Sequence, residues 1–488
     1  MEPIGVKRLL PTILFLLCVD LTAEVDGHGQ RQVTEPPAAN DELPAADVAP
    51  TDCADWKTMR FFESATVEDV ASCLDGGADP NARSPVSNST PLHNAASYNE
   101  DAAVAKALIA DGADPNASSR GFQTPLHSAA FAGHRAVIEA LIAAGADPRA
   151  RDASGQTTLH FAAAGRNAAV VPVLVAAGAD PAGRDNDGRT ALHRAASSGW
   201  TSVAMIEAIV AAGTDLEARD NRGWTALHAA ANNNANDAIT GALLAGGADP
   251  MATNREGETA LHIAALRRNP TAVLALIEAR SRLRARDNSG RMPLHRAAAY
   301  NRNAEVIEAM IAKGADANAP DASGSTPLHN AASANPNEAV LEVLIAARAD
   351  LEARSQRGET PLHVVNFARN ADVLLKAGAD VQSRDRLERT PLHHAAEGVR
   401  EWEVIPVLIA HRAELNAMDQ RGDTPLHVAA NNGFRAMVMA MLSAGAQPAL
   451  RNAQGETPLD VAEDSESFKR SEAYRRLKEA STGNLDAN

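Results

Sequence analysis

A four-residue signature, Thr-Pro-Leu-His or a close variant, recurs twelve times along the chain and constrains its fold more than any other feature. Most consecutive copies begin 33 to 35 residues apart, whereas only 30 residues separate Thr360 from Thr390. The copies begin at Thr90, Thr124, Thr157, Thr190, Thr225, Thr259, Met292, Thr326, Thr360, Thr390, Thr424 and Thr457. A fixed period of about 20–50 residues is typical of proteins that stack one small structural unit many times.

Each copy carries the signals of two short helices. The threonine can cap a helix start, and a proline after it fits the first helical turn, where no N–H group is needed. A pair of alanines such as Ala129-Ala130 follows, and then an apolar run over residues 137–142 with helical spacing. Gly145 marks the end of the second helix, and the polar residues 151–155 form a turn. Each unit therefore predicts a helix, a short turn, a helix and a hairpin-like loop.

These units resemble ankyrin repeats, and the resemblance covers about residues 55–480. It implies an all-α solenoid of about twelve helix-turn-helix units, preceded by an N-terminal capping half-unit and joined by hairpin-like loops. It also implies a concave face formed by the loop tips and the first helices. Aromatic residues are only 3% of the chain, which is unusual for a large globular core because these rings bury the most area per residue.

The first segment has the pattern of an export signal. Lys7 and Arg8 precede an apolar run over residues 9–19, and Ala23 is a small residue suited to cleavage. The run is too short to span a bilayer, which takes about 20 apolar residues. We therefore expect an exported protein, periplasmic or extracellular, with no stable membrane insertion after cleavage.

The remaining domain boundaries follow from composition and from the repeat. Residues 24–51 are rich in proline, alanine and acidic residues and contain no aromatic residue, which favours a flexible linker. The predicted organisation is a signal peptide over 1–23, a linker over 24–51, an N-terminal capping unit over 52–83, an ankyrin array with its C-terminal cap over 84–481 and a tail over 482–488.

Cys53 and Cys73 are the only cysteines that remain after removal of the signal peptide. They stand at the ends of two predicted antiparallel helices of the capping unit, which brings them together. We expect a Cys53–Cys73 disulfide, with two buried free thiols as the alternative.

Several units depart from the pattern. Arg280, Arg348 and Arg412 replace the glycine that ends the second helix, so these positions should be strained or should end their helices differently. The unit from Thr360 is about one helical turn short and should be pinched. Asp460 replaces the last signature histidine, in a final unit whose charge suits a solvent-facing cap.

The histidines favour a structural interpretation over catalysis. Eleven of the fifteen are the fourth residue of the signature, where the resemblance implies hydrogen bonds to backbone between neighbouring units. One histidine per unit cannot form a metal site, and we expect the adjacent His394 to be exposed. No metalloprotease, phosphate-loop or serine-hydrolase motif is present. We therefore expect no enzyme activity and no cofactor or metal, and the net charge of −16 disfavours nucleic acid.

Binding is expected at the two variable regions that ankyrin-like arrays expose. The predicted loop-tip residues are Phe122, Arg189, Arg222, Trp224, Arg255 and Arg386, and the predicted first-helix residues are Tyr98, Phe131, Asn232, Asn233, Leu266, Arg267, Tyr300 and Phe367. Tryptophan, tyrosine and arginine are favoured at binding hot spots, and Arg222 with Trp224 is the strongest pair. Some of these rings could instead pack against the next unit, and we assign Trp200 and Trp402 to packing or to the convex side.

The predicted function is a non-catalytic, monomeric scaffold that binds one or more partner proteins through the concave face and loop tips. The alternatives are a secreted or periplasmic inhibitor or activator of a specific enzyme, and a host-directed effector. The identity of the partner does not follow from the sequence.

Overall fold

The computed structural model describes residues 53–233, 238–267, 270–279, 281–462 and 466–482. The predicted signal peptide and linker, Arg280 and residues 483–488 of the predicted tail lie outside these ranges. The chain divides into two compact units, residues 1–186 and 187–488, which are called here the N-terminal and C-terminal units. Each is described by itself.

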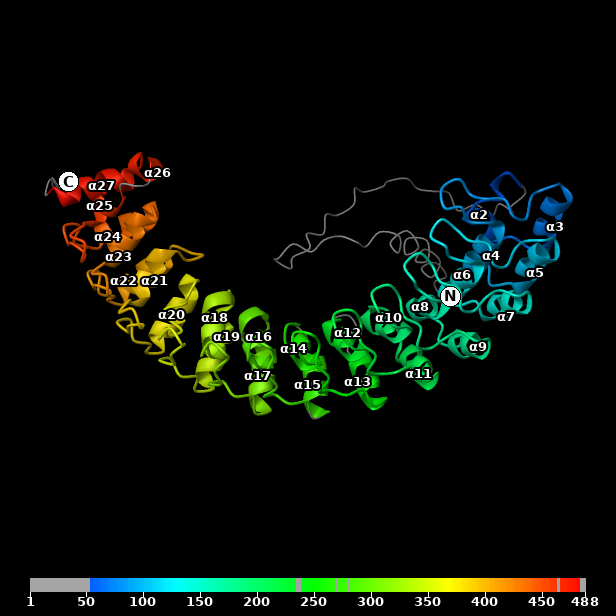
Figure 1. Ribbon diagram of the computed structural model, residues 1–488, viewed down its shortest axis with the longest axis horizontal. Helices are drawn as coiled ribbons and strands as arrows, with labels where there is room; N and C mark the ends of the chain where they lie inside the picture. The colour runs from blue at the N-terminus through cyan, green and yellow to red at the C-terminus, as the bar shows by residue number, and fades with distance from the viewer. Residues whose placement is uncertain (1–52, 234–237, 268–269, 280, 463–465, 483–488) are drawn as a thin grey trace, which may run out of the picture. The chain divides into compact units, whose positions relative to one another are not determined.

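Both units consist of paired helices, with no strand in the described ranges beyond two isolated bridges (Figure 1). The N-terminal unit begins with a short 3-10 helix (η1, Cys53–Asp55) and helices α2 (Met59–Phe62) and α3 (Val67–Asp75). Its three repeats pair α4 (Pro91–Tyr98) with α5 (Ala102–Ala110), α6 (Pro125–Ala132) with α7 (Arg135–Ala143), and α8 (Thr158–Ala164) with α9 (Val170–Ala176).

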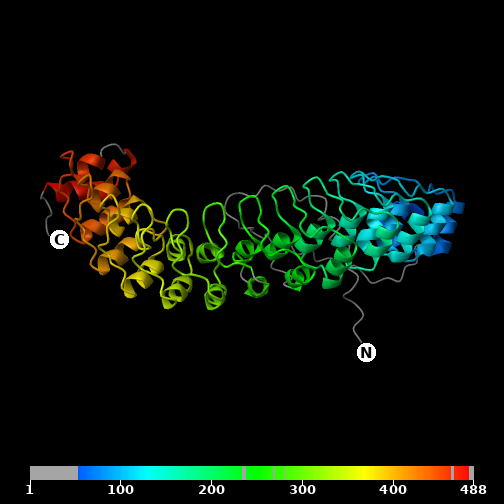
Figure 2. The same ribbon diagram turned by 60° about the horizontal axis from the view of Figure 1, so that its bottom comes forward.

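The C-terminal unit continues the same pairing. Its first helices are α10 (Ala191–Ser197), α12 (Ala226–Asn232), α14 (Ala260–Ala264), α16 (Pro293–Tyr300), α18 (Pro327–Ala334), α21 (Pro391–Glu397), α23 (Pro425–Asn431) and α25 (Pro458–Val461). Its second helices are α11 (Val203–Ala211), α13 (Ala238–Ala245), α15 (Pro270–Glu278), α17 (Ala304–Ala312), α19 (Glu338–Ala346), α20 (Ala368–Lys376), α22 (Val404–Ala410) and α24 (Arg435–Ser443), followed by α26 (Glu466–Lys469) and α27 (Glu472–Ser481). Within this unit the loops of successive repeats project to the same side (Figure 2).

The signature histidine links each helix start to the next repeat. In the copy at Thr326, the threonine N–H donates to Nδ1 of His329 at 3.1 Å, and His329 Nε2 lies 2.9 Å from the carbonyl oxygen of Glu359 in the next loop. Because a backbone N–H only donates and a carbonyl only accepts, this pairing requires a neutral ring with the proton on Nε2. The structural role inferred for these histidines is confirmed for this copy and for the others whose two bonds are described.

The core of each unit lies between its helices and is built from small and branched side chains. Ala129 and Ala130 on α6 are fully buried, as are Val137 and Ile138 on α7. Alanine pairs allow first helices of neighbouring repeats to pack closely, so many short helices share one continuous core without large rings. The all-helical solenoid expected from the repeat is thus confirmed.

The N-terminal cap holds a cluster of aromatic rings and a covalent link. Trp56, Phe61 and Phe62 are buried with ring centroids 5.0–5.8 Å apart. The structure contains the disulfide expected from the sequence between Cys53 and Cys73, whose Cα atoms are 5.6 Å apart. The ring cluster and the disulfide together close the exposed end of the stack.

Two of the irregular positions behave as the sequence predicts. Arg348 and Arg412 have φ angles of 61° and 65°, in the left-handed region where glycine ends most of the other second helices.

The short unit that begins at Thr360 lacks part of its first helix: residues 361–364 form turns, and α20 follows at Ala368. The missing helical turn therefore comes from the first helix, whereas the second helix keeps its full length.

A line of buried asparagines carries the stacking through this short unit. Asn335 donates from Nδ2 to the carbonyl oxygen of Asn301 at 2.7 Å, and Asn370 donates to that of Asn335 at 2.7 Å. Asn370 lies on α20, whereas Asn301 and Asn335 each follow a first helix. The second helix of the short unit thus supplies the contact that a first-helix end supplies elsewhere.

Candidate partner-binding surface

Arg222 and Trp224 form one structure at the tip of the loop before α12. The Arg222 guanidinium carbon lies 4.2 Å from the centre of the Trp224 ring, within cation–π range. Its Nε is 3.5 Å from the buried carboxylate of Asp220, while 64% of the Arg222 side chain remains exposed. The guanidinium therefore lies over an aromatic ring while most of the Arg222 side chain faces solvent.

The loop that carries this pair is fixed by its own polar groups. Asp220 Oδ1 accepts the N–H groups of Arg222 and Trp224, each at 2.8 Å. Gly223 has a φ of 78°, and a Cβ there would lie 2.9 Å from the backbone nitrogen of Arg255. Only glycine fits between these two loops, so the tip at Arg222 and the tip at Arg255 keep one arrangement.

The neighbouring predicted arginines differ in their surroundings. Arg255 is exposed, and its N–H donates to the carbonyl oxygen of Arg222 at 3.2 Å. Arg189 pairs with Asp187 at 2.5 Å and is partly exposed. The structure therefore brings Arg222, Trp224 and Arg255 together on adjacent loop tips.

The predicted rings on first helices are exposed to different degrees. Tyr300, at the end of α16, is 59% exposed, and Phe122 is 61% exposed on its loop with a φ of 58°. Tyr98 and Phe131 in the N-terminal unit are half-buried, and burial raises the pKa of the Tyr98 hydroxyl. Leu266 is also half-buried.

Two predicted binding residues make contacts within the fold. Asn233 donates from Nδ2 to the carbonyl oxygen of Ser198 at 2.9 Å, because α12 ends one residue earlier than α16 and moves this position into the stacking role. Phe367 is 9% exposed, because the missing helical turn of the short unit places it at the start of α20. These contacts leave only part of the Asn233 side chain and little of the Phe367 ring for a partner.

Asn232 and Arg267 contact each other across neighbouring repeats. The Arg267 guanidinium donates to Oδ1 of Asn232, and the burial of this side chain lowers the pKa of Arg267. Both side chains are half-buried, so each presents only part of its surface to a partner.

Trp200 and Trp402 do not pack into the core. They are 52% and 42% exposed, respectively, which argues against packing and leaves the convex side as the predicted location of these two rings. Both follow the end of a first helix, where the chain turns toward the second helix.

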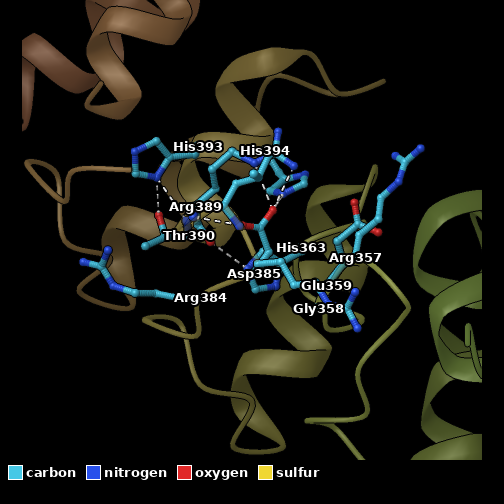
Figure 3. A network of polar contacts seen from close by, with 12 residues as sticks. Arg357, Gly358, Glu359, His363, Arg384, Asp385, Arg389, Thr390, His393 and His394 are labelled. Carbon is cyan, nitrogen blue, oxygen red and sulfur yellow. Dashed lines mark hydrogen bonds and ion pairs between the residues drawn. The ribbon is translucent and has the colours of Figure 1, made fainter. Parts of the chain in front are cut away.

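His394 is not the exposed residue that its position beside the signature suggested. Only 11% of its side chain is exposed, and Nε2 donates to Oδ2 of Asp385 at 2.9 Å (Figure 3). Arg389 reaches the same carboxylate oxygen at 2.8 Å, and its other nitrogen contacts Glu397 at 2.6 Å. Burial alone would raise the pKa of Asp385, but the hydrogen bonds from His394 and Arg389 outweigh it and lower that pKa to about 2.

A polar groove of about 710 Å³ lies in the C-terminal unit between the loop tips and α23. Leu387 and Arg421 line it from the loops, His427 and Asn431 line it from the helix, and Asn432 lines it just after the helix ends. Sequence reasoning selected none of these residues as binding residues. The signal available in the sequence was the position of Leu387 and Arg421, each of which stands in a loop shortly before a signature threonine.

Within the described ranges, no three histidine, cysteine or acidic side chains are grouped so that they could hold a metal ion. In the same part of the chain, no helix combines the length and the apolar character needed to cross a membrane.

The comparisons with known proteins agree with the repeat. The family model for ankyrin repeats in three copies matches eight overlapping stretches, 63–152, 137–220, 202–287, 227–321, 270–355, 294–385, 328–419 and 392–482. Among curated proteins, mouse oxysterol-binding protein-related protein 1 is 42% identical over 53 residues, and human neurogenic locus notch homolog protein 4 is 45% identical over 62 residues. These matches cover 11% and 13% of this chain but only 6% and 3% of the two relatives.

Solved structures of ankyrin domains are also similar. The ankyrin domain of Bcl-3 shares 29% identity, covering 46% of this chain and 100% of that domain with a TM-score of 0.38. The human ASB11 ankyrin domain shares 26% identity, covering 47% of this chain and 99% of that domain with a TM-score of 0.42. The ankyrin fold is typical of protein–protein interaction domains. Because the family model matches most of the chain from residue 63 to residue 482, the protein belongs to the ankyrin-repeat family.

Proposed function

We propose that this protein binds a partner protein non-covalently, through the loop tips and first helices of its C-terminal unit. The observation that carries the proposal is the Arg222–Trp224 pair, in which the guanidinium carbon lies 4.2 Å from the ring centre and the Arg222 side chain remains exposed. A fixed loop presents this pair, so little conformational entropy is lost when a partner docks. Arginine and tryptophan together are characteristic of binding hot spots.

The test is capture of a partner from the native source by the protein and by the double variant Arg222→Ala, Trp224→Ala. A matched control, Arg369→Ala with Trp402→Ala, removes the same residue types from outside the loop tips, where both side chains are exposed. We expect the tip variant to lose about tenfold or more in affinity for the captured protein, while the control binds normally and both variants melt like the parent. Equal capture by the tip variant and the parent would contradict the proposal.

We also propose that the protein works outside the cytosol. The apolar run over residues 9–19 supports export, and so does the Cys53–Cys73 disulfide, because disulfides persist in oxidising compartments. The mass of the protein recovered from its source tests this proposal. Loss of residues 1–23 is the expected result, and recovery of the intact chain from the cytosol alone would contradict it.

A further inference from the structure

Asp287 shows what a loop aspartate does when the chain supplies it with charged donors. It stands five residues before the end-to-end signature that starts at Met292, and its Oδ1 accepts the N–H groups of Ser289 and Arg291 in its own loop, each at 2.9 Å. Its Oδ2 accepts from Nε of Arg291 at 3.0 Å, and Nη1 of Arg296 lies 3.8 Å away. One donor therefore stands directly before the signature and the other directly after it.

Asp385 repeats this arrangement in the copy at Thr390. Its Oδ2 contacts Arg389 at 2.8 Å and accepts from Nε2 of His394 at 2.9 Å, and both side chains point toward this carboxylate in Figure 3. Arg389 again stands directly before the signature and His394 directly after it. Two loops of the C-terminal unit thus fill the space beside the aspartate with donors from the chain itself.

The next copy, at Thr424, keeps the aspartate but lacks both donors. Oδ1 of Asp419 accepts the N–H groups of Arg421 and Asp423 at 2.7 and 2.9 Å, so the loop is held in the same way. The two donor positions are occupied by Asp423 and Val428. No residue in the described part of the chain donates to Oδ2 of Asp419, and Asp423 adds a second carboxylate to the same groove.

The polar groove of about 710 Å³ lies where these donors are missing, and its size is within the range of ligand pockets. Two arginines line it, but Arg389 is already paired with Asp385 and Glu397, which leaves the exposed Arg421. The carboxylates that line the groove are those of Glu397, Asp419, Asp423 and Glu456. The described lining therefore carries an excess of negative charge, which a cation from outside would offset.

The loop that follows holds two of these carboxylates in place. Nδ2 of Asn452 donates to Oδ1 of Asp423 at 2.8 Å and to Oε2 of Glu456 at 3.3 Å. One neutral amide thus bridges two carboxylates, and each keeps an oxygen to which no described residue donates.

The groove also has apolar lining. Leu387 is 49% exposed, and Val428 and Val461 are half-buried. An arginine side chain matches this combination, because its methylene stem packs along apolar surface while its guanidinium donates to carboxylates.

We propose that this groove binds an arginine side chain from an exposed segment of a partner protein, with the guanidinium at the carboxylates of Asp419 and Asp423. The guanidinium takes the place that internal donors take beside Asp287 and Asp385. The proposal rests on the proposed function and deepens it, because it names the chemistry of one partner contact on the same unit. Arginine is favoured over lysine because its planar fork donates to two oxygens at once. The net charge of −16 attracts a basic partner.

The first test uses the full-length protein without a ligand. Val428→Arg puts a guanidinium at the position that Arg296 has in its own copy, and Val428→Gln is the neutral control. Val428→Arg should melt about 2 °C higher than Val428→Gln. In the background Asp419→Asn, Asp423→Asn this gain should vanish, because the two sites are coupled. No gain in the parent background, or an equal gain in both backgrounds, would contradict the proposal.

The second test measures binding of a short glycine–serine peptide with one central arginine, by saturation-transfer NMR at millimolar peptide. Peptides with lysine, or with the neutral analogue citrulline, at the same position are the comparators. The groove variant Asp419→Asn, Asp423→Asn keeps the Oδ1 acceptors of the loop. The matched control, Asp316→Asn, Asp321→Asn, removes two carboxylates that accept N–H groups in another part of the same unit.

We expect the parent to bind the arginine peptide about tenfold more tightly than the citrulline peptide, with lysine between them, and the control variant to behave like the parent. The groove variant and Val428→Arg should each lose this preference. No preference in the parent, preference for lysine, or a preference that survives in the groove variant would each overturn the proposal. Arg222 and Trp224 are unchanged in all these variants, so such a failure is distinguishable from a failure of the proposed function.

Discussion

The imidazole Nε2 of His394 donates to the carboxylate of Asp385 at 2.9 Å, which joins helix α21 to the loop that precedes it. Asp385 is 1% exposed at its side chain and also accepts a charged hydrogen bond from Arg389. The loop that carries Arg386 and Leu387 therefore has a buried ionic anchor.

This anchor predicts a stability change at acidic pH. The hydrogen bonds that outweigh burial hold the folded-state pKa of Asp385 at about 2, below its usual value near 4. A depressed carboxyl pKa stabilises the fold above pH 4, and that contribution is lost as the pH falls from 4 toward 2. Asp385→Asn should therefore destabilise the protein by about 1–2 kcal/mol at pH 7, after allowance for solvent screening, and by less at pH 3. Denaturant midpoints at the two pH values measure the difference, and an equal loss at both would contradict the assignment.

The signature histidines predict a separate loss of stability on acidification, which begins at a higher pH than the loss due to Asp385. Burial lowers the pKa of His228, His262 and His363 to about 4, below the usual 6.5. A lowered histidine pKa means that the unfolded chain takes up protons first, so stability falls as the pH drops from 6.5 toward 4. The expected slope is about 1 kcal/mol per pH unit for each such histidine in one cooperative unit.

Melting temperature as a function of pH checks this expectation. The parent should lose stability steadily between pH 6.5 and 4.5, and His228→Gln should show a shallower dependence, because one titrating group is gone. A flat profile in the parent over that interval would mean that these rings take up protons as readily in the fold as in the unfolded chain, which would contradict the lowered pKa values.

Removal of the disulfide should lower the stability of the N-terminal cap. Cys53 and Cys73 are 20 residues apart, and closing a loop of that length stabilises a fold by about 3 kcal/mol in the chain-entropy model. The Cys53→Ser, Cys73→Ser variant should expose Trp56 at lower denaturant concentration than the parent, as its fluorescence reports. Thiol counting on the denatured protein without reductant, on a chain that starts at residue 24, should find none. Two free thiols would disprove the bond.

The short unit contains one residue, Asn370, whose substitution should lower the stability of the fold. Asn370 is fully buried on α20 and donates to the carbonyl oxygen of Asn335, so Asn370→Ala leaves that acceptor unpaired in the core. We expect a loss of about 1–3 kcal/mol in the free energy of unfolding. The exposed Asn431 offers the matched control, since Asn431→Ala should change stability by less than about 0.5 kcal/mol. Equal effects of the two changes in denaturant melts would argue against the stacking role.

The sequence predicted the repeating architecture because each of its twelve signatures repeats the same local physics, which short-range preferences determine. It did not predict the contacts of Phe367 or Asn233. A first helix that is shorter by one residue or by one turn moves the positions that follow it into different surroundings. His394 was missed for another reason. Its partner Asp385 lies nine residues earlier, on the far side of the signature, and only the folded loop brings the two together.

A footprint of the captured partner on this protein tests the central claim most directly. Hydrogen exchange of the free and bound protein should show protection at the loop tips and first helices, including the loop that carries Arg222 and Trp224. The outer faces of second helices such as α11 and α13 should exchange unchanged. Protection confined to the second helices, with no change at the loop tips, would contradict the account.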